Sequence, residues 1–263
     1  MNAQEYNFIK HKVLKLTNVD LNYYKSAQMQ RRLGTYLLRS GHKSWANFFR
    51  AIQNDPVEIG KLKDYLTINV SSFFRDAKKF ESLRKSVLPE LLTQRPRLRV
   101  WSAGCSNGHE PYSLAIMLAE VTGFYCRHFI LATDIDRSAL TRARAGGPYR
   151  ADNVTNVSPT LLRRYFKTHD DGHYVDQKLR QKVTFRYHDL LKGSFENNFD
   201  LIVCRNVVIY FTAEIKERLY RRFFDALRLG GVLFVGGTEV LSKTAAQGFE
   251  LRDISFYRKA SKH

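Results

Sequence analysis

The sequence predicts an α/β protein in which a doubly wound parallel sheet follows an all-α amino-terminal domain. Residues 99–118 read as an apolar strand, a glycine turn and the opening of a helix in one run. Three more apolar strands begin near residues 128, 183 and 199. Residues 1–62 show only helical periodicity. We therefore expect a helical domain over residues 1–66 and a sheet domain over residues 67–263.

The helical domain is predicted from apolar residues spaced three and four apart. Tyr6, Ile9 and Val13 form the first such stripe. Later helices are expected over residues 28–40 and around Trp45. Asn54, Asp55 and Pro56 end the helix around Trp45, and a further helix is expected from about residue 57 toward residue 66.

A second helical stretch, residues 69–95, connects the two predicted domains. Pro89 is expected to kink or interrupt it, because proline cannot continue the hydrogen-bond ladder of a helix. Asn69 and Arg75 are its notable polar members. Its apolar face is expected to contain Phe73, Phe74, Phe80, Leu83 and Val87.

The loop that follows the first strand predicts a ligand site. Gly104 and Gly108 allow the backbone to turn sharply and to approach a ligand closely. The loop lacks the Gly-Lys-Ser/Thr of a P-loop and the third glycine of a dinucleotide fingerprint, and Glu110 at a helix start disfavours a pyrophosphate. Glu110 suits a cofactor with positive charge and with hydroxyl and amine donors, as in S-adenosylmethionine. The alternative is an ordinary strand, turn and helix with a solvated glutamate.

Carboxylates also follow the next two predicted strands. Asp134 closes the strand in residues 128–136 and is expected to accept hydrogen bonds from ribose hydroxyls, whereas Asp136 is expected to cap the next helix. The strand from Val183 is expected to end at Asp189. Because parallel strands present their carboxyl ends to one crevice, these side chains are expected to face the same ligand.

Three further features complete the predicted sheet domain. An insertion over about residues 162–182 reads as a small antiparallel hairpin with its turn at residues 170–172, and a plain surface excursion is the alternative. A later helix is expected to begin at Thr212 and to end at Gly230–Gly231. A strand and a terminal hairpin, within residues 231–259, are expected at the edge of the sheet.

Composition limits the environment of the chain. Its 263 residues suffice for one large and one small domain, and no apolar run approaches the roughly 20 residues of a membrane span. The start lacks the pattern of a secretory leader. Its three cysteines are far apart and show no metal-ligand spacing. We expect a reduced, cytoplasmic, metal-free monomer that does not insert into a membrane.

The formal net charge of +18 calls for an explanation. Residues 1–62 are the most basic part, with ten Lys or Arg and four Asp or Glu. A basic surface that serves solubility, an acidic protein partner and a nucleic acid are the alternatives. No nucleic-acid module is recognisable in the basic segment.

Five sequence blocks occur in a specific order, NVSSFFR, AGCSNGHEPYS, ATDID, VCRNVVIYF and GVLFVGGTE. Together they resemble the CheR family of chemotaxis receptor glutamate O-methyltransferases across almost the whole chain. The resemblance implies a class I, Rossmann-like methyltransferase domain with an inserted antiparallel β-subdomain, preceded by a helical domain. It implies transfer of a methyl group from S-adenosylmethionine to glutamate side chains on the cytoplasmic methylation helices of chemoreceptors, with S-adenosylhomocysteine as the product and no nucleic-acid partner.

The resemblance also implies roles for individual residues. Arg75 and Tyr210 stand where the family places residues near the transferred methyl. Asp189 and Leu190 occupy positions that the family places beside the adenine. Asp134 occupies the position that the family places toward the ribose. The positions expected to bind the cofactor are Asn69, Ser71, Arg75, Gly104, Glu110, Asp134, Asp189, Leu190, Arg205 and Asn206.

The chain departs from the family pattern at two places. His109 replaces an acidic residue found in many members and is expected to face solvent or to cap the helix. The hairpin turn around Gly172 looks shorter than in members that bind a receptor tether peptide, so tether binding is not expected.

Two other functions stay open. A nucleic-acid methyltransferase would fit the positive net charge. Such enzymes usually have an Asn/Asp-Pro-Pro-aromatic pattern after the fourth strand, and this chain lacks that pattern. A non-catalytic scaffold that binds S-adenosylmethionine would have lost Arg75 and Tyr210, and both are present.

Overall fold

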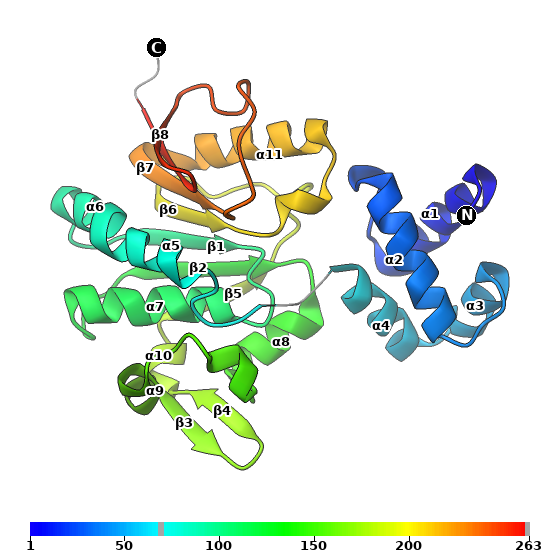
Figure 1. Cartoon of the computed structure of the whole chain (residues 1–263), viewed down its shortest axis with the longest axis horizontal. Coiled ribbons are helices and arrows are strands. Elements are labelled where there is room, and N and C mark those ends of the chain that lie inside the picture. Colours follow the sequence, from blue (N-terminus) through cyan, green and yellow to red (C-terminus); the bar gives the residue numbers. More distant parts are fainter. Residues whose placement is uncertain (68–70, 261–263) are drawn as a thin grey trace. The chain divides into compact units, whose positions relative to one another are not determined.

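A computed structural model describes residues 1–67 and 71–260 of the chain (Figure 1). These residues form two compact units. The helical unit contains the described residues up to Thr67 together with Ile209–Lys216, and the sheet unit contains the other described residues. Each unit has its own buried apolar core.

The helical unit is built from four α-helices and a short 3-10 helix among its first 67 residues, as the periodicity predicts. Asn2 caps the first helix by accepting a hydrogen bond from the backbone N–H of Glu5, and Asn18 ends it in a left-handed conformation with φ 59°. The apolar stripes of the helices meet in one core that includes Ile9, Leu33 and Phe48. The elements are α1 (Ala3–Thr17), η1 (Leu21–Tyr23), α2 (Ser26–Arg39), α3 (Trp45–Ile52) and α4 (Pro56–Thr67).

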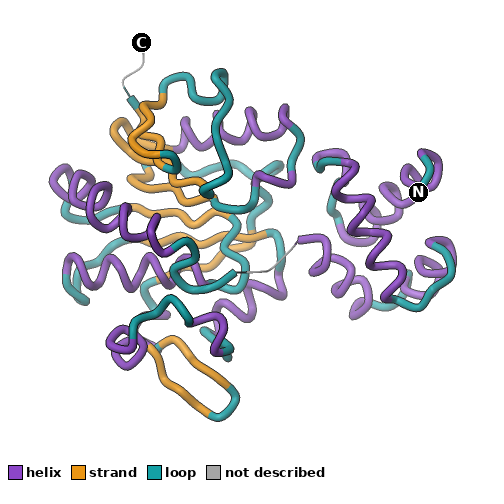
Figure 2. Tube along the Cα trace, viewed as in Figure 1, coloured by secondary structure: helices purple, strands orange, loops and turns teal. Residues whose placement is uncertain are grey.

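The sheet unit contains a seven-stranded sheet, and Figure 2 draws its strands in orange. The strand order is β5-β2-β1-β6-β7-β9-β8. The first five strands in this order run parallel, and β9 and β8 are added antiparallel at one edge. This confirms the predicted doubly wound sheet with a terminal hairpin. Its strands are β1 (Arg99–Ala103), β2 (Phe129–Asp134), β5 (Val183–Tyr187), β6 (Phe199–Cys204), β7 (Leu227–Val235), β8 (Phe249–Asp253) and β9 (Phe256–Lys259).

Helices connect the strands of the sheet. The predicted helical stretch before β1 consists of α5, a π-helical turn η2 and α6, and Pro89 lies in the first turn of α6, where a missing N–H is tolerated. None of the described helices has the length and apolar character that a bilayer span requires. The helical elements are α5 (Ala77–Ser82), η2 (Leu83–Val87), α6 (Leu88–Gln94), α7 (His109–Thr122), α8 (Arg137–Ala145), η3 (Ala151–Val154), η4 (Val208–Tyr210) and α11 (Ala213–Ala226).

The predicted hairpin insertion is present. Strands β3 (Phe166–His169) and β4 (Gly172–Val175) form a two-stranded antiparallel sheet between α9 (Pro159–Tyr165) and α10 (Gln177–Arg180). Tyr149 extends the sheet, because it exchanges two backbone hydrogen bonds of 2.8 Å with His173. The hairpin is therefore an ordered subdomain and not a plain surface loop.

The predicted end of the last helix at Gly230–Gly231 is wrong. The helix ends at Ala226, and both glycines lie inside β7. Phe199 of β6 pairs with Leu227, but Leu201 pairs with Val232, so β7 carries extra residues at this point. Gly230, with φ 76°, supplies the left-handed backbone that such a bulge needs.

Candidate functional site

The candidate site lies where the parallel strands β1, β2, β5 and β6 end. The glycine turn after β1 is fixed against β2, because the backbone N–H groups of Gly104 and Cys105 donate to the carbonyl of Thr133 at 2.8 and 2.9 Å. Gly104 has φ 87°, and a Cβ at this position would collide with Val207 in the loop after β6. Glycine is thus required both for the turn and for the close approach of two loops.

Glu110 occupies the first turn of α7, close to this loop. Its Oε1 accepts a hydrogen bond of 2.8 Å from the Ser102 hydroxyl, and its Oε2 lies 3.7 Å from Arg205 Nη1. Burial raises the pKa of Glu110, and the positive charges of Arg205 and Arg75 partly offset that effect. A cationic ligand group would stabilise the ionised carboxylate further.

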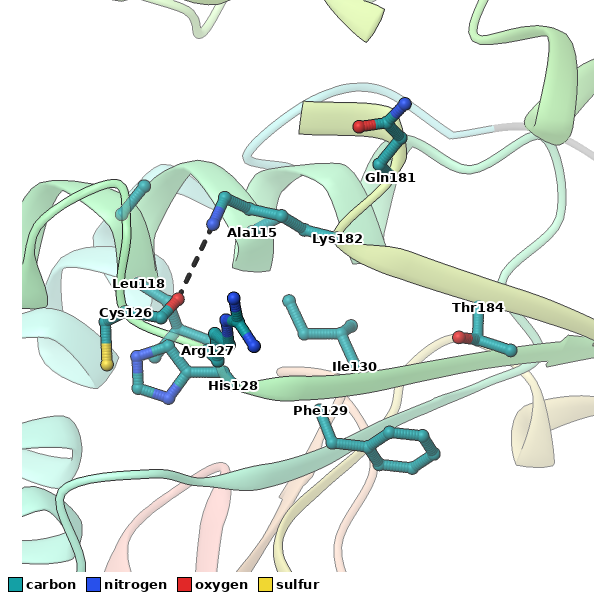
Figure 3. A pocket seen from close by; sticks show the side chains of 11 residues that line it. Ala115, Leu118, Cys126, Arg127, His128, Phe129, Ile130, Gln181, Lys182 and Thr184 are labelled. Atoms are coloured by element: carbon teal, nitrogen blue, oxygen red, sulfur yellow. Dashed lines mark hydrogen bonds between the residues drawn. The ribbon is translucent and has the colours of Figure 1, made fainter. Parts of the chain in front are cut away.

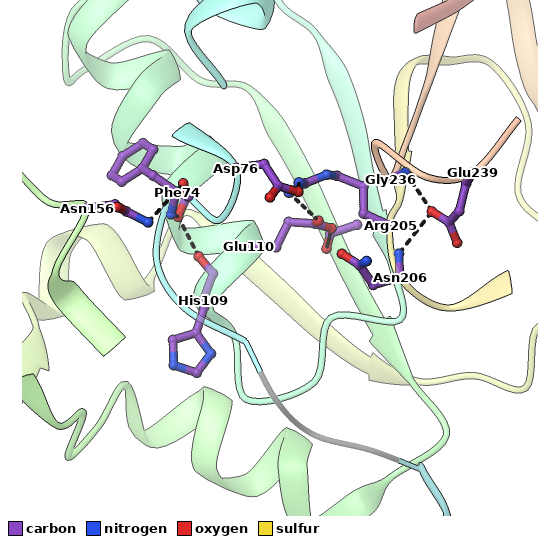
Figure 4. A network of polar contacts seen from close by, with 11 residues as sticks. Phe74, Asp76, His109, Glu110, Asn156, Arg205, Asn206, Gly236 and Glu239 are labelled. Atoms are coloured by element: carbon purple, nitrogen blue, oxygen red, sulfur yellow. Dashed lines mark hydrogen bonds and ion pairs between the residues drawn. The ribbon is translucent and has the colours of Figure 1, made fainter. Parts of the chain in front are cut away.

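Arg205 follows the end of β6 and bridges two carboxylates. Its side chain is only 2% exposed and forms ion pairs with Asp76 and Glu110 (Figure 4). The guanidinium also lies over the rings of Phe234 and Phe80, 4.8 and 5.4 Å from their centroids. The site therefore has a buried cation that joins the loop before α5 to the start of α7.

Arg75 lies in a constrained loop before α5. Its two neighbours, Phe74 and Asp76, are both left-handed, with φ 49° and 59°. The N–H of Phe74 donates to the Ser113 hydroxyl at 2.9 Å, and the Phe74 carbonyl accepts from Asn156 at 3.5 Å. These contacts of Phe74 and the ion pair of Asp76 with Arg205 hold the loop on both sides of Arg75.

Two other predicted residues, Ser71 and Asn69, precede Arg75 in the chain. The carbonyl of Ser71 accepts a hydrogen bond of 3.5 Å from the Asn153 side chain, and the carbonyl of Asn153 accepts one of 2.8 Å from the Phe73 N–H. Asn69 lies outside the described residues.

Asp134 ends β2 and organises two turns. Its Oδ2 accepts from the N–H of Ser106 at 2.8 Å, and its Oδ1 accepts from the N–H of Asp136 at 2.9 Å. Burial raises the pKa of Asp134. Asp136 caps α8 by accepting from the N–H groups of Ser138 and Ala139, which confirms its predicted role.

Asp189 lies beyond the end of β5. The prediction that this strand ends at Asp189 is wrong, because the strand ends at Tyr187. Asp189 Oδ1 accepts from the N–H of Leu191 at 2.8 Å and thereby starts a turn, which ends the extended conformation. The neighbouring Leu190 is buried, and its carbonyl accepts a hydrogen bond from Arg222.

Asn206 and a glutamate that the sequence analysis did not single out form a second contact between loops. Asn206 is left-handed, with φ 58°, and its N–H donates to Glu239 Oε2 at 3.0 Å (Figure 4). The N–H of Gly236 donates to the same oxygen at 2.6 Å. Glu239 is 3% exposed. The only sequence signal for it is its place in the block GVLFVGGTE.

Tyr210 belongs to the helical unit, unlike the other described residues of the predicted set. It ends the short helix η4, and its carbonyl accepts a hydrogen bond of 2.9 Å from the N–H of Lys25. A bridge between Tyr24 and Phe211 holds the same segment. The structure therefore brings together Arg75, Gly104, Glu110, Arg205 and Asn206 within the sheet unit and groups Tyr210 with the helices.

The expectation that His109 faces solvent or caps the helix is wrong. His109 is 3% exposed and packs edge-on against Phe73, with ring centroids 5.2 Å apart, and against Tyr149 at 4.8 Å. Burial lowers the pKa of His109 to about 4. The first turn of α7 is covered by other elements, so the residue next to Glu110 points into the core.

A pocket of about 230 Å³ lies elsewhere in the sheet unit (Figure 3). It is lined by α7 and by the residues that enter β2 and β5, among them His128 and Lys182. These residues are at the amino ends of the strands, whereas the candidate site is at their carboxyl ends. The pocket is therefore separate from the candidate site.

Comparisons with known proteins agree with this geometry. Residues 69–257 match the family described as CheR methyltransferase, SAM binding domain, and residues 4–67 match the CheR methyltransferase all-alpha domain. The chain is 41% identical over 258 residues to a chemotaxis protein methyltransferase of Listeria monocytogenes, a match that covers 97% of both chains. It is 35% identical over 238 residues, 87% of both chains, to chemotaxis protein methyltransferase 1 of Pseudomonas aeruginosa.

Proposed function

Because this chain belongs to the CheR methyltransferase family, we propose that it methylates glutamate side chains of chemoreceptors and so forms the methyl esters used in chemotactic adaptation. The match to two relatives named as chemotaxis protein methyltransferases, over nearly the full length of both chains in one case, carries the proposal. The chain is an S-adenosylmethionine-dependent methyltransferase.

The residues of the site fit S-adenosylmethionine. Glu110 is a largely buried carboxylate whose ionised form is disfavoured by burial, so the ammonium and sulfonium of the cofactor would supply the missing positive charge. Asp134 ends the second strand, where a ribose hydroxyl is expected in this architecture. Asn69, Ser71, Arg75, Gly104, Asp189, Leu190, Arg205 and Asn206 complete the set that we assign to the cofactor.

The reaction needs orientation more than acid–base chemistry. A glutamate side chain has a reference pKa of about 4.3, so it is already an anionic nucleophile at neutral pH. The bound cofactor supplies an activated methyl group. Holding nucleophile and methyl in line can contribute roughly 7–11 kcal/mol. Arg75 would orient a carboxylate in this arrangement, and the Tyr210 hydroxyl would donate one hydrogen bond.

Opposite charges are neutralised in the transition state, so a partly desolvated site favours the reaction. Buried residues at the site support this, since Arg205 and Glu239 are both buried. The partner is proposed to be the cytoplasmic methylation helices of a chemoreceptor, and the enzyme is proposed to act as a cytoplasmic monomer. The net charge of +18 suits an acidic partner.

Methyl transfer to receptor-bearing membranes tests the proposal. With S-adenosylmethionine labelled in its methyl group, we expect label that alkali releases as methanol, because carboxyl esters are base-labile. The variant Arg75→Ala should lower the initial rate by about 100-fold, as expected when a reacting group is misplaced, with little change in melting temperature. Label that resists alkali or is removed by nuclease would contradict the proposal, and equal losses of rate and stability would make Arg75 structural.

A further inference from the structure

Glu239 joins the ends of two neighbouring strands. It lies in the loop after β7, and one of its oxygens, Oε2, accepts from the N–H of Gly236, just past β7, and from the N–H of Asn206, just past β6. The distances are 2.6 and 3.0 Å (Figure 4). A buried carboxylate that accepts two backbone N–H groups is a strong and directional anchor.

Arg205 and Val207 flank the anchored residue Asn206 in the chain. Asn206 is left-handed, a conformation that side-chain-bearing residues seldom adopt without support. The chain bends after Arg205, whose guanidinium pairs with Asp76 and Glu110, and Val207 in the bend lies against Gly104. Glu239 also lies close enough to Glu110 for its charge to raise the pKa of that carboxyl.

We infer that Glu239 is a positioning residue for the methyl donor: by holding the turn at Asn206, it presents Arg205 and Asn206 to S-adenosylmethionine and keeps Val207 on the glycine loop. The inference rests on the assignment of Arg205 and Asn206 to the cofactor. Glu239 itself acts through the backbone of the turn.

Two adjacent glycines provide a matched test. A Cβ added at Gly236 would collide with Glu239 Oε2, whereas a Cβ added at Gly237 meets no atom within 4 Å. Gly236→Ala should therefore displace the carboxylate without removing it, and it should weaken binding of S-adenosylhomocysteine in calorimetry by about tenfold or more, like Glu239→Ala. Gly237→Ala should bind within about twofold of the wild type. The amide oxygen of Glu239→Gln can accept both N–H groups, so this variant should restore most of the affinity.

A buried carboxylate at the opposite end of β6 controls for general destabilisation. Asp200 is fully buried, accepts from the N–H of Arg99 at 2.6 Å and pairs with Arg228. Asp200→Asn should lower the melting temperature but leave the affinity of the folded protein unchanged. Because Glu239 is inferred to act on cofactor binding through the turn at Asn206, Glu239→Ala should raise KM for S-adenosylmethionine more than it lowers kcat.

The outcomes separate this inference from the proposed function. If the wild type binds S-adenosylhomocysteine and both Glu239→Ala and Gly236→Ala bind equally well, the positioning role is wrong and the methyltransferase assignment stands. The role is also wrong if Asp200→Asn loses as much affinity as Glu239→Ala. A wild-type protein that binds neither the cofactor nor its demethylated product would instead contradict the proposed function.

Discussion

Burial works against the ionised form of Glu110, and the cations around it only partly offset this effect. Arg205 Nη1 is 3.7 Å from the carboxylate, and the positive charge of Arg75 lowers the pKa of Glu110 by a smaller amount. The pKa of Glu110 is therefore raised above its ordinary value. A buried carboxylate with a raised pKa destabilises the free protein when it is ionised. A positively charged ligand that binds beside it stabilises the ionised form.

The variant Glu110→Gln should consequently separate stability from binding. The folded protein takes up a proton at Glu110 at a higher pH than the unfolded chain does, so the unfavourable contribution of this group is present at neutral pH and is relieved as the pH falls through the raised pKa. Glu110→Gln should raise the melting temperature of the free protein at neutral pH. It should also weaken binding of S-adenosylmethionine by roughly 10–100-fold, the effect of losing one charge-assisted contact.

Calorimetry across a pH series checks this prediction. Wild-type affinity should fall as the pH is lowered from neutral through the raised pKa of Glu110, and the Glu110→Gln profile should be flatter. Glu120→Gln is a matched control, because Glu120 lies on the same helix and pairs with Arg164 at 2.6 Å, far along the helix from the site. Unchanged affinity in Glu110→Gln would exclude Glu110 from cofactor binding.

The residues of the site were predictable to different degrees. Glu110 and Asp134 could be found because each follows a strand at a recognisable distance. Asp76 and Glu239 could not, because the residues they contact are remote in sequence: Asp76 pairs with Arg205, 129 positions away, and Glu239 holds Asn206, 33 positions away. Burial of His109 was missed for the same reason.

At the scale of the elements, the conformation of the loop after β1 depends on Gly104. Gly104 combines a positive φ with close contact to Val207, so an added methyl group would introduce both strain and overlap. The start of α8 was easier to predict, because its cap, Asp136, acts on backbone N–H groups only two and three residues away. The bulge of β7 at Gly230 was missed, because the need for it arises only from pairing with β6.

The variant Gly104→Ala should be markedly less stable than a glycine variant that introduces strain alone. Gly41 shares a positive φ of 73°, but a Cβ at that position meets no atom within 4 Å. Gly41→Ala should cost about 1–2 kcal/mol of unfolding free energy from strain. Gly104→Ala should cost roughly 1–3 kcal/mol more, because its methyl group overpacks against Val207.

Urea denaturation measures both free energies, and calorimetry shows whether binding of S-adenosylhomocysteine is lost only in Gly104→Ala. Equal destabilisation by the two substitutions would mean that the loops after β1 and β6 are not in close contact.

At the scale of the whole molecule, the helical unit stands out by its excess of positive charge. Residues 1–62 contain ten Lys or Arg and four Asp or Glu. Arg31 and Arg32 on α2 are two of these basic residues, and the structure distinguishes them. Arg31 is exposed, whereas Arg32 donates to the carbonyl of Tyr65 and lies over its ring, 4.7 Å from the centroid. Arg31 is therefore the better probe of a receptor surface, because reversing its charge removes no such contact.

The variant Arg31→Glu should raise KM for receptor by about two- to tenfold at low salt, because the loss of one exposed charge weakens long-range attraction. Cofactor affinity should be unchanged. The effect should shrink as ionic strength rises. Lys15→Glu makes the same change of charge at an exposed position of α1. Equal effects of the two variants would mean that total charge, and not a surface of α2, governs receptor binding.

The sequence by itself determined the order of helices and strands, the glycine turn after the first strand and the carboxylates at the strand ends. These follow from periodicity, capping and turn chemistry, which act over a few neighbouring residues. Only the tertiary structure decided that Arg205 is buried between Asp76 and Glu110, that Glu239 anchors the turn at Asn206, and that His109 faces the core. Contacts between residues far apart in the chain set burial and charge pairing, and no local pattern encodes them.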